Sequence, residues 1–196
     1  ALYPLLSVIA KSLGITSAGA GAVSSAYFLF YVLLQIPSGM LADRWGTKRV
    51  LIIMFALSGL GILGFGLFGT TYLPLLFFSA LHGFGAGAYY PCCFGTIMAT
   101  VPPEKRGTSS GLIGIGMALG ILGGMAASGP LYEFFGNYRQ PFLVLAVPTV
   151  LMLFAFVRLL PDARPSAASP SLSVYGRLFR DRDIWKIHAA TFCSLY

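Results

Sequence analysis

The stretch Gly39-Met-Leu-Ala-Asp-Arg-Trp-Gly-Thr-Lys-Arg49 lies between two long apolar runs. It holds one acidic and three basic residues, although only 10% of the chain is charged. This pattern predicts two membrane-spanning helices joined in a tight hairpin, and the three bases place the turn on the cytoplasmic side. Asp43 is predicted to meet the N-terminus of another helix, because the unpaired N–H groups and the dipole there attract a carboxylate.

The same stretch resembles the signature of the major facilitator superfamily of membrane transporters. That signature is Gly-x-Leu-x-Asp-Arg-x-Gly followed by two bases, between the second and third helices. Thr47 departs from it, because a base is common at this place. The residues that match are Gly39, Leu41, Asp43, Arg44 and Gly46, followed by the bases Lys48 and Arg49.

The composition predicts that the bilayer is the solvent of this chain. Of 196 residues, 57% are hydrophobic and 24 are glycine, which is more apolar surface than a soluble domain of this size hides. A span needs about 20 apolar residues, so six spans fit. The predicted class is an all-α integral membrane protein. The resemblance implies that its six helices form two inverted three-helix units, followed by the start of a seventh helix.

The basic residues follow the predicted topology. Eleven of the thirteen Lys and Arg residues fall in predicted inner segments, and only Lys11 and Arg139 fall in outer ones. This bias predicts that both ends are cytoplasmic. The membrane is expected to be the plasma (inner) membrane. Because the bases lie in loops between spans, the net charge of +7 does not predict a nucleic-acid partner.

Three segments are predicted along the chain. Residues 1–160 form the helical bundle with an incomplete first helix, and residues 161–183 form a cytoplasmic linker with an interfacial amphipathic helix. Residues 184–196 open the seventh span. Both ends of the chain lie in apolar runs, which predicts a piece of a longer protein whose second six-helix half is the partner. The later helices of the bundle are predicted at 22–42, 50–68, 74–101, 108–132 and 140–160.

One face of the second helix is polar. Tyr27, Tyr31, Gln35 and Gly39 are spaced by four and share this face. Two interpretations stand: the face lines a substrate cavity, or it makes only hydrogen bonds between helices. Lys11, near the end of the first helix, also has two interpretations. It offers a cation to an anionic substrate, or it extends to the outer headgroups.

The fourth helix carries the next informative pattern. Gly83 and Gly87, followed by Pro91, resemble the fourth-helix motif of the superfamily, in which an arginine stands where this chain has Ser79. These two glycines are predicted to pack against other helices. The absence of that arginine weighs against a proton antiporter. His82 is the histidine inside a predicted span. It either serves substrate or proton binding in a cavity, or hydrogen-bonds a neighbouring helix.

One pattern precedes the fifth helix, and a second pattern lies within it. Glu104 and Arg106 resemble the family's loop before this helix, and the resemblance implies a cytoplasmic charge cluster with Asp43 and Arg44; the alternative is a solvated loop. The helix itself carries a repeat of small residues, predicted to pack closely against other helices. The repeat consists of Gly116, Gly120 and Gly124.

The function that the resemblance implies is secondary active transport of a small solute by alternating access, with H⁺ or Na⁺ as the candidate coupling ion. A channel or a non-transporting membrane scaffold is the alternative. No paired metal motif, nucleophile elbow or acid pair stands within a span, so the sequence predicts neither an enzyme nor a metal or cofactor site. The substrate itself is not predicted.

Overall fold

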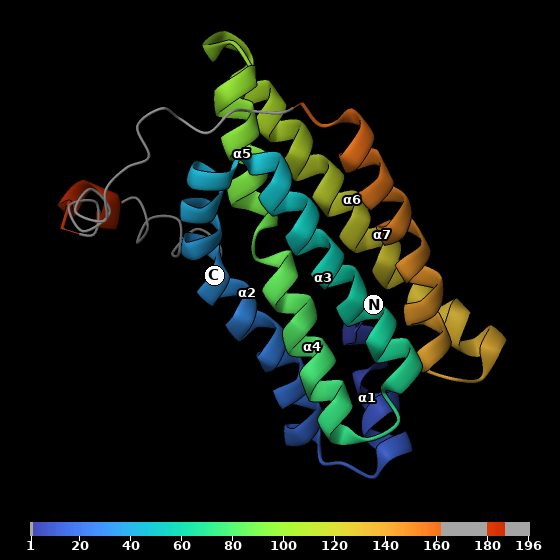
Figure 1. Cartoon of the computed structure of the whole chain (residues 1–196). Helices are drawn as coiled ribbons and strands as arrows, with labels where there is room; N and C mark the ends of the chain where they lie inside the picture. Colours follow the sequence, from blue (N-terminus) through green and yellow to red (C-terminus); the bar gives the residue numbers. More distant parts are fainter. Residues whose placement is uncertain (1, 162–179, 187–196) are drawn as a thin grey trace.

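The computed structural model describes residues 2–161 and 180–186, and the long helices of the first range lie side by side (Figure 1). Of the described helices, α2, α3, α6 and α7 are long and apolar enough to cross a membrane. The helices are α1 (Leu2–Leu13), α2 (Ser17–Trp45), α3 (Thr47–Phe68), α4 (Tyr72–Ala86), α5 (Tyr89–Thr100), α6 (Pro103–Phe135) and α7 (Arg139–Leu159).

The junction of α2 and α3 is a single residue, Gly46. Its φ of 90° and ψ of 141° lie in a region that glycine enters without a steric penalty. The Gly46 N–H donates to the Ala42 carbonyl at 2.9 Å, and the Gly46 carbonyl accepts from the Val50 N–H at 3.3 Å. The prediction of a charged loop between helices ending at 42 and starting at 50 was therefore wrong. The charged residues lie in the last turn of α2 and the first turn of α3.

The predicted fourth helix, 74–101, is divided into α4 and α5. Gly87 and Ala88 leave the regular helix but keep right-handed backbone angles, so the change is a local break and not a loop. The physical cause is Pro91, which has no N–H for the Gly87 carbonyl and whose ring crowds that carbonyl.

Helix α6 is longer than predicted at both ends. Pro103 occupies its first turn, where the missing N–H costs nothing, so the predicted inner loop at 102–107 is mostly helical. Pro130 lies inside the helix, which continues to Phe135, three residues beyond the predicted end at 132. Gly136 ends the helix with a φ of 64°, and its N–H donates to the Tyr132 carbonyl at 2.8 Å.

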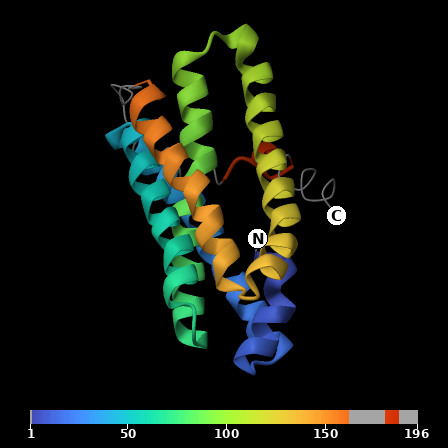
Figure 2. The ribbon, with the colours of Figure 1, turned by 90° about the vertical axis from the view of Figure 1, so that its right-hand side faces the viewer.

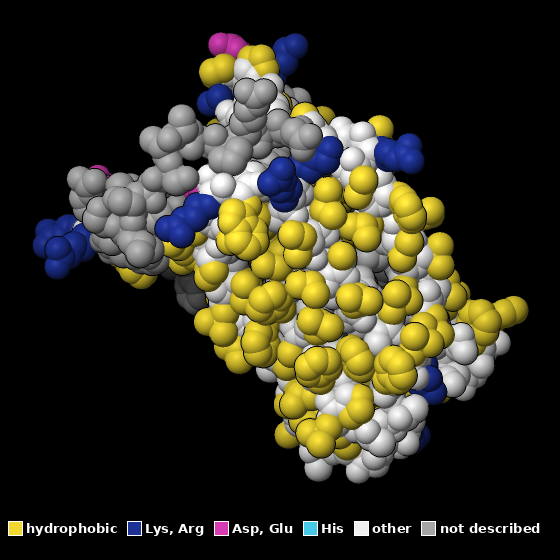
Figure 3. Space-filling view, viewed as in Figure 1, with side chains coloured by type: hydrophobic (Ala, Val, Ile, Leu, Met, Phe, Trp, Pro, Cys, Tyr) yellow, Lys and Arg dark blue, Asp and Glu magenta, His cyan; other side chains and the backbone are white. Residues whose placement is uncertain are grey.

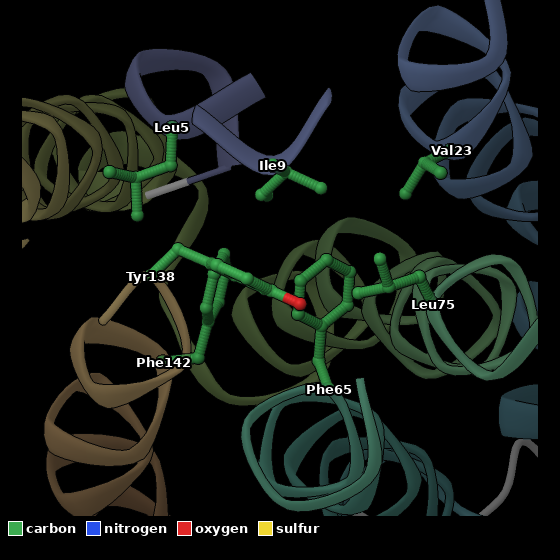
Figure 4. Close-up of a cluster of buried hydrophobic side chains, with 7 residues drawn as sticks. All are labelled: Leu5, Ile9, Val23, Phe65, Leu75, Tyr138 and Phe142. Atoms are coloured by element: carbon green, nitrogen blue, oxygen red, sulfur yellow. The ribbon is translucent and has the colours of Figure 1, made fainter. Parts of the chain in front are cut away.

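Two apolar clusters hold the helices together. The first joins α1, α2, α3, α4 and the start of α7 around Phe65, whose ring centroid lies 4.4 Å from that of Phe142 (Figure 4). Beside it, the Tyr138 hydroxyl donates to the Gly69 carbonyl at 2.6 Å. The second cluster joins α2, α3 and α5 around Leu51 and Cys92. The core therefore lies among α1 to α5 and α7, and α6 contributes little to it.

The outer surface between the two ends is apolar. Hydrophobic side chains cover the face seen in Figure 3, and Lys and Arg gather near one end of it. Leu73, Leu151 and Phe154 are among the exposed large side chains, at 73%, 64% and 65% exposure. An apolar surface of this extent needs a cover, and a bilayer supplies one.

The predicted linker and seventh span lie almost wholly outside the described residues. Within 180–186, the Lys186 ammonium lies 2.7 Å from the Asp183 carboxylate. This exposed pair contributes little to stability.

Candidate functional site

A cavity of about 660 Å³ lies among α2, α3, α4, α6 and α7. Its volume falls within the range of small-molecule sites, roughly 300–1,000 Å³. The side chains from α2 and α4 include most of its polar groups, whereas α3, α6 and α7 contribute mainly apolar ones. Five lining residues with a polar side chain come from α2 and α4: Ser24, Tyr27, Tyr31, Ser79 and His82.

His82 is fixed from one side. Its Nδ1 lies 2.7 Å from the Ser58 hydroxyl oxygen and 3.2 Å from the Ser58 carbonyl oxygen. With the proton on Nδ1 the ring donates to Ser58, and with the proton on Nε2 it accepts from the hydroxyl. In both tautomers Ser58 occupies Nδ1, which leaves Nε2 as the nitrogen for a ligand. The two sequence interpretations of His82 are therefore compatible: it bonds a neighbouring helix and lines the cavity.

The ring of Tyr27 on α2 lies beside His82, and the ring of Tyr31 lies next to that of Tyr27. The Tyr27 ring centroid lies 5.0 Å from that of His82 and 5.8 Å from that of Tyr31, to which it is nearly parallel. Gln35 is not among the lining residues. The predicted polar face of α2 thus divides: Tyr27 and Tyr31 line the cavity, and Gln35 does not.

Ser79, at the position of the family's arginine, joins two helices. Its side chain is 3% exposed, and its hydroxyl donates to the Val23 carbonyl at 2.7 Å. Ser24, the next residue on α2, is 8% exposed, and its Oγ has no hydrogen-bond partner within the described chain. The sequence analysis missed Ser24, although its place one turn before Tyr27 is a signal that was available.

Glycines let α4 lie directly against α2 and α3. A Cβ on Gly83 would overlap the Tyr27 carbonyl oxygen. A Cβ on Gly87 would lie 2.6 Å from the Tyr31 carbonyl oxygen. From α3, a Cβ on Gly61 would lie 2.5 Å from the His82 backbone nitrogen. These approaches bring the cavity-lining stretches of α2 and α4 together, as small residues do in membrane helices.

Other predicted residues lie apart from this arrangement. Lys11 is exposed in the last turn of α1 and is not among the lining residues. No atom lies within 4 Å of a Cβ placed on Gly116 or Gly120. The close helix contact predicted for Gly116 and Gly120 is therefore not made within the described residues. The reason is that α6 contacts α1, α5 and α7 and that no helix of the described chain covers this row. Helix α6 lies at the edge of the bundle (Figure 2). Gly120 and Gly124 instead border the cavity.

The signature residues lie at the α2–α3 junction, away from the cavity. Asp43 and Lys48 are half-buried there, whereas Arg44 and Arg49 are exposed. Thr47, which replaces the family's base, is 8% exposed and accepts a hydrogen bond from the Thr96 hydroxyl at 2.9 Å. The side chain of Thr47 is packed against α5.

Arg106 completes the end of a helix. Its guanidinium donates to the Val101 carbonyl at 3.0 Å and to the Met98 carbonyl at 2.9 Å. These carbonyls belong to the C-terminal end of α5, where a cation also offsets the helix dipole. Arg106 therefore has a structural role, and the charge cluster predicted for it with Glu104 stays a prediction.

Comparison with known proteins places this arrangement in a family. The family model described as Major Facilitator Superfamily matches residues 1–196. The chain is 35% identical over 141 residues to probable anion transporter 7 of Oryza sativa subsp. japonica, covering 71% of this chain and 32% of that protein. It is 33% identical over 141 residues to monocarboxylate transporter 11 of Mus musculus, covering 67% and 31%. The quinolone resistance protein NorB of Staphylococcus aureus is 27% identical over 163 residues, covering 78% and 35%.

This chain belongs to the Major Facilitator Superfamily. The family comprises membrane transporters, which are not enzymes, and the apolar helices agree with an integral membrane protein. The chain spans about a third of the length of these three relatives.

Proposed function

We propose that this chain is the N-terminal half of a secondary transporter that moves a small solute by alternating access. In this proposal α1 to α7 make six crossings, with α4 and α5 together forming the fourth. The cavity forms half of the binding site, and a second six-helix half supplies the rest. Both ends of the half lie on the cytoplasmic side of the plasma membrane, and H⁺ or Na⁺ is the candidate coupling ion.

The observation that carries the proposal is the cavity itself. It collects His82, Tyr27 and Ser24 from two helices that cross at glycines, inside a bundle whose outer face is apolar. Polar groups gathered within a membrane bundle are typical of a solute site. Two of the three relatives are named for anions, as an anion transporter and a monocarboxylate transporter. The third is named for resistance to quinolone drugs.

The signature at the α2–α3 junction supports a cytoplasmic latch. In the proposal Asp43 meets the N-terminus of a helix of the second half when the cytoplasmic side is closed, and Arg44 holds Asp43 in position. A contact that breaks in every cycle contributes at most a few kcal/mol, because both states must stay populated.

Alternating access is tested with cysteines placed on α6. Gly120→Cys borders the cavity and Gly114→Cys does not, and both positions have open space for a Cβ. In full-length protein whose native cysteines are replaced, an impermeant maleimide should label Gly120→Cys from either side of the membrane without crossing it. Gly114→Cys should label from neither side.

The same measurement separates the alternatives. A channel would let the reagent cross to the far side. A scaffold without a moving cavity would leave Gly120→Cys unlabelled from at least one side. Either result contradicts the proposal, and neither depends on the identity of the solute.

The latch is tested by Asp43→Asn. Loss of the carboxylate should reduce the rate of transport in proteoliposomes more than the affinity, because the latch acts on closure and not on binding. Glu133→Gln is the matched control, because Glu133 is an exposed acid in the last turn of α6. It should change neither the rate of transport nor the affinity. Normal transport by Asp43→Asn would contradict the latch.

A further inference from the structure

We infer that the solute is an amphipathic aromatic compound, neutral or singly cationic, held by hydrogen bonds from Ser24 Oγ and His82 Nε2. This inference rests on the proposed function, because it names the class of solute for the same cavity. It goes beyond that function because it excludes anions as the main class of solute that these cavity residues bind.

The charge of the cavity lining limits which solutes can bind. Among the described residues that line the cavity, none is Lys, Arg, Asp or Glu. An anion that enters this space loses its hydration and meets no cation from this wall, which is a large free-energy cost. Arg139, the cation at the end of α7, instead donates from Nε to the Gly66 carbonyl at 2.7 Å and also bonds the Leu67 carbonyl. It is therefore committed to the end of α3.

Several polar groups of the cavity already have a hydrogen-bond partner in the protein. Ser79 donates to the Val23 carbonyl, Thr149 donates to the Leu145 carbonyl at 3.3 Å, and Nδ1 of His82 bonds Ser58. The Ser24 Oγ stands out because it is buried and without a hydrogen-bond partner in the described chain. A buried hydroxyl left without a partner costs free energy, and a ligand that bonds it recovers that cost.

His82 supplies the second polar contact. Ser58 holds Nδ1 and thereby fixes the ring, so Nε2 is the atom left to meet a ligand. Because Nε2 donates in one tautomer and accepts in the other, it accommodates a ligand hydroxyl, amine or carbonyl.

The aromatic and apolar side chains that line the cavity favour a flat, apolar solute. The Tyr27 ring lies 5.1 Å from Phe28 and 5.8 Å from Tyr31, centroid to centroid, so three rings of α2 stand close together. Aromatic faces attract flat rings and cations. Helices α3 and α7 border the same cavity with partly exposed apolar side chains, among them Ile62 and Leu145, which bury the apolar body of a ligand.

The inference is tested by counterflow in proteoliposomes of the full-length protein. The two probes are ethidium, an aromatic monocation, and benzenesulfonate, an aromatic anion. Ethidium should exchange with saturation, and benzenesulfonate should not compete with it. Exchange of benzenesulfonate without ethidium would overturn the class of solute and leave alternating access intact. Absence of ethidium exchange overturns the inference whatever the anion does, while the cysteine labelling of Gly120→Cys judges the transport cycle separately.

The two contacts are tested with matched variants. Ser24→Ala should raise the half-saturating ethidium concentration about fivefold, the value of one hydrogen bond. Ser25→Ala, the neighbouring exposed serine, should leave it unchanged. His82→Asn keeps an amide near the Nδ1 position and removes Nε2, so it should cause a similar rise, which His82→Gln should partly restore. An unchanged half-saturating concentration in both Ser24→Ala and His82→Asn would overturn the assignment of these groups.

Discussion

In α4, Gly83 and Gly85 lie against the backbone of neighbouring helices, whereas in α6 the glycines at 116 and 120 face open space. Both helices carry small residues at short intervals, and the sequence predicts close packing for both. The difference is what stands opposite: α4 crosses α2 and α3, but no helix covers the glycine row of α6 within the described chain. A small-residue repeat therefore permits close approach without requiring it.

The largest effect is expected from Gly83→Ala. The added methyl overlaps the Tyr27 carbonyl oxygen, which belongs to a backbone and cannot rotate away, so α2 and α4 must separate. Overpacking of this kind costs about 3 kcal/mol. Thermal unfolding of the purified protein in detergent should show a large loss of stability or no folded protein. A melting temperature equal to that of the parent would contradict the close approach.

A smaller loss is expected from Gly46→Ala at the junction of α2 and α3. The Gly46 φ of 90° is unfavourable for a residue with a Cβ, and holding alanine there costs about 2 kcal/mol. Gly107→Ala is the control, because Gly107 lies in α6 with open space around it. Equal melting temperatures for the two variants would show that the junction does not need glycine.

Ser79→Ala should cost about 1 kcal/mol, because it removes the hydrogen bond to the Val23 carbonyl and leaves the helix contact in place. The loss should appear in denaturant or thermal unfolding, and Ser25→Ala should show none. If Ser79→Ala unfolds like the parent, the glycines alone hold α2 and α4 together.

The smallest effect, with opposite sign, is expected from Gly116→Ala. The methyl meets nothing within 4 Å, and alanine is favoured over glycine inside a helix, so stability should rise by about 0.5 kcal/mol. Measured beside Gly83→Ala, this variant tests the comparison most directly. A marked loss of stability would indicate that α6 packs closely after all.

The sequence predicted most of the helices but misplaced their ends at charges, glycines and prolines. The predicted helix at 50–68 agrees with α3 to within three residues, because a long apolar run between polar ends has a clear length. At Gly46 and Pro103 the predicted loops proved to be helix ends. Charged side chains at the end of a span extend to water, so charge alone does not mark where a helix stops.

The candidate site was predicted only in part. His82, Tyr27 and Tyr31 were named as candidates because polar groups are costly in a span, and the structure places them at one cavity. Ser24 escaped notice, because serine is common in membrane helices as a packing residue. Its significance depends on an unfilled hydrogen bond, which exists only relative to its neighbours.

The sequence by itself determined that the chain lies in a bilayer, that it is all-helical and to which family it belongs. The reason is that the length of an apolar run, the position of charges and a short signature are local properties of the chain. Only the tertiary structure decided which glycines are pressed against a neighbour, which hydroxyls are already bonded and which side chains share a cavity. These properties depend on what lies across from each residue, and residues far apart in the chain supply it.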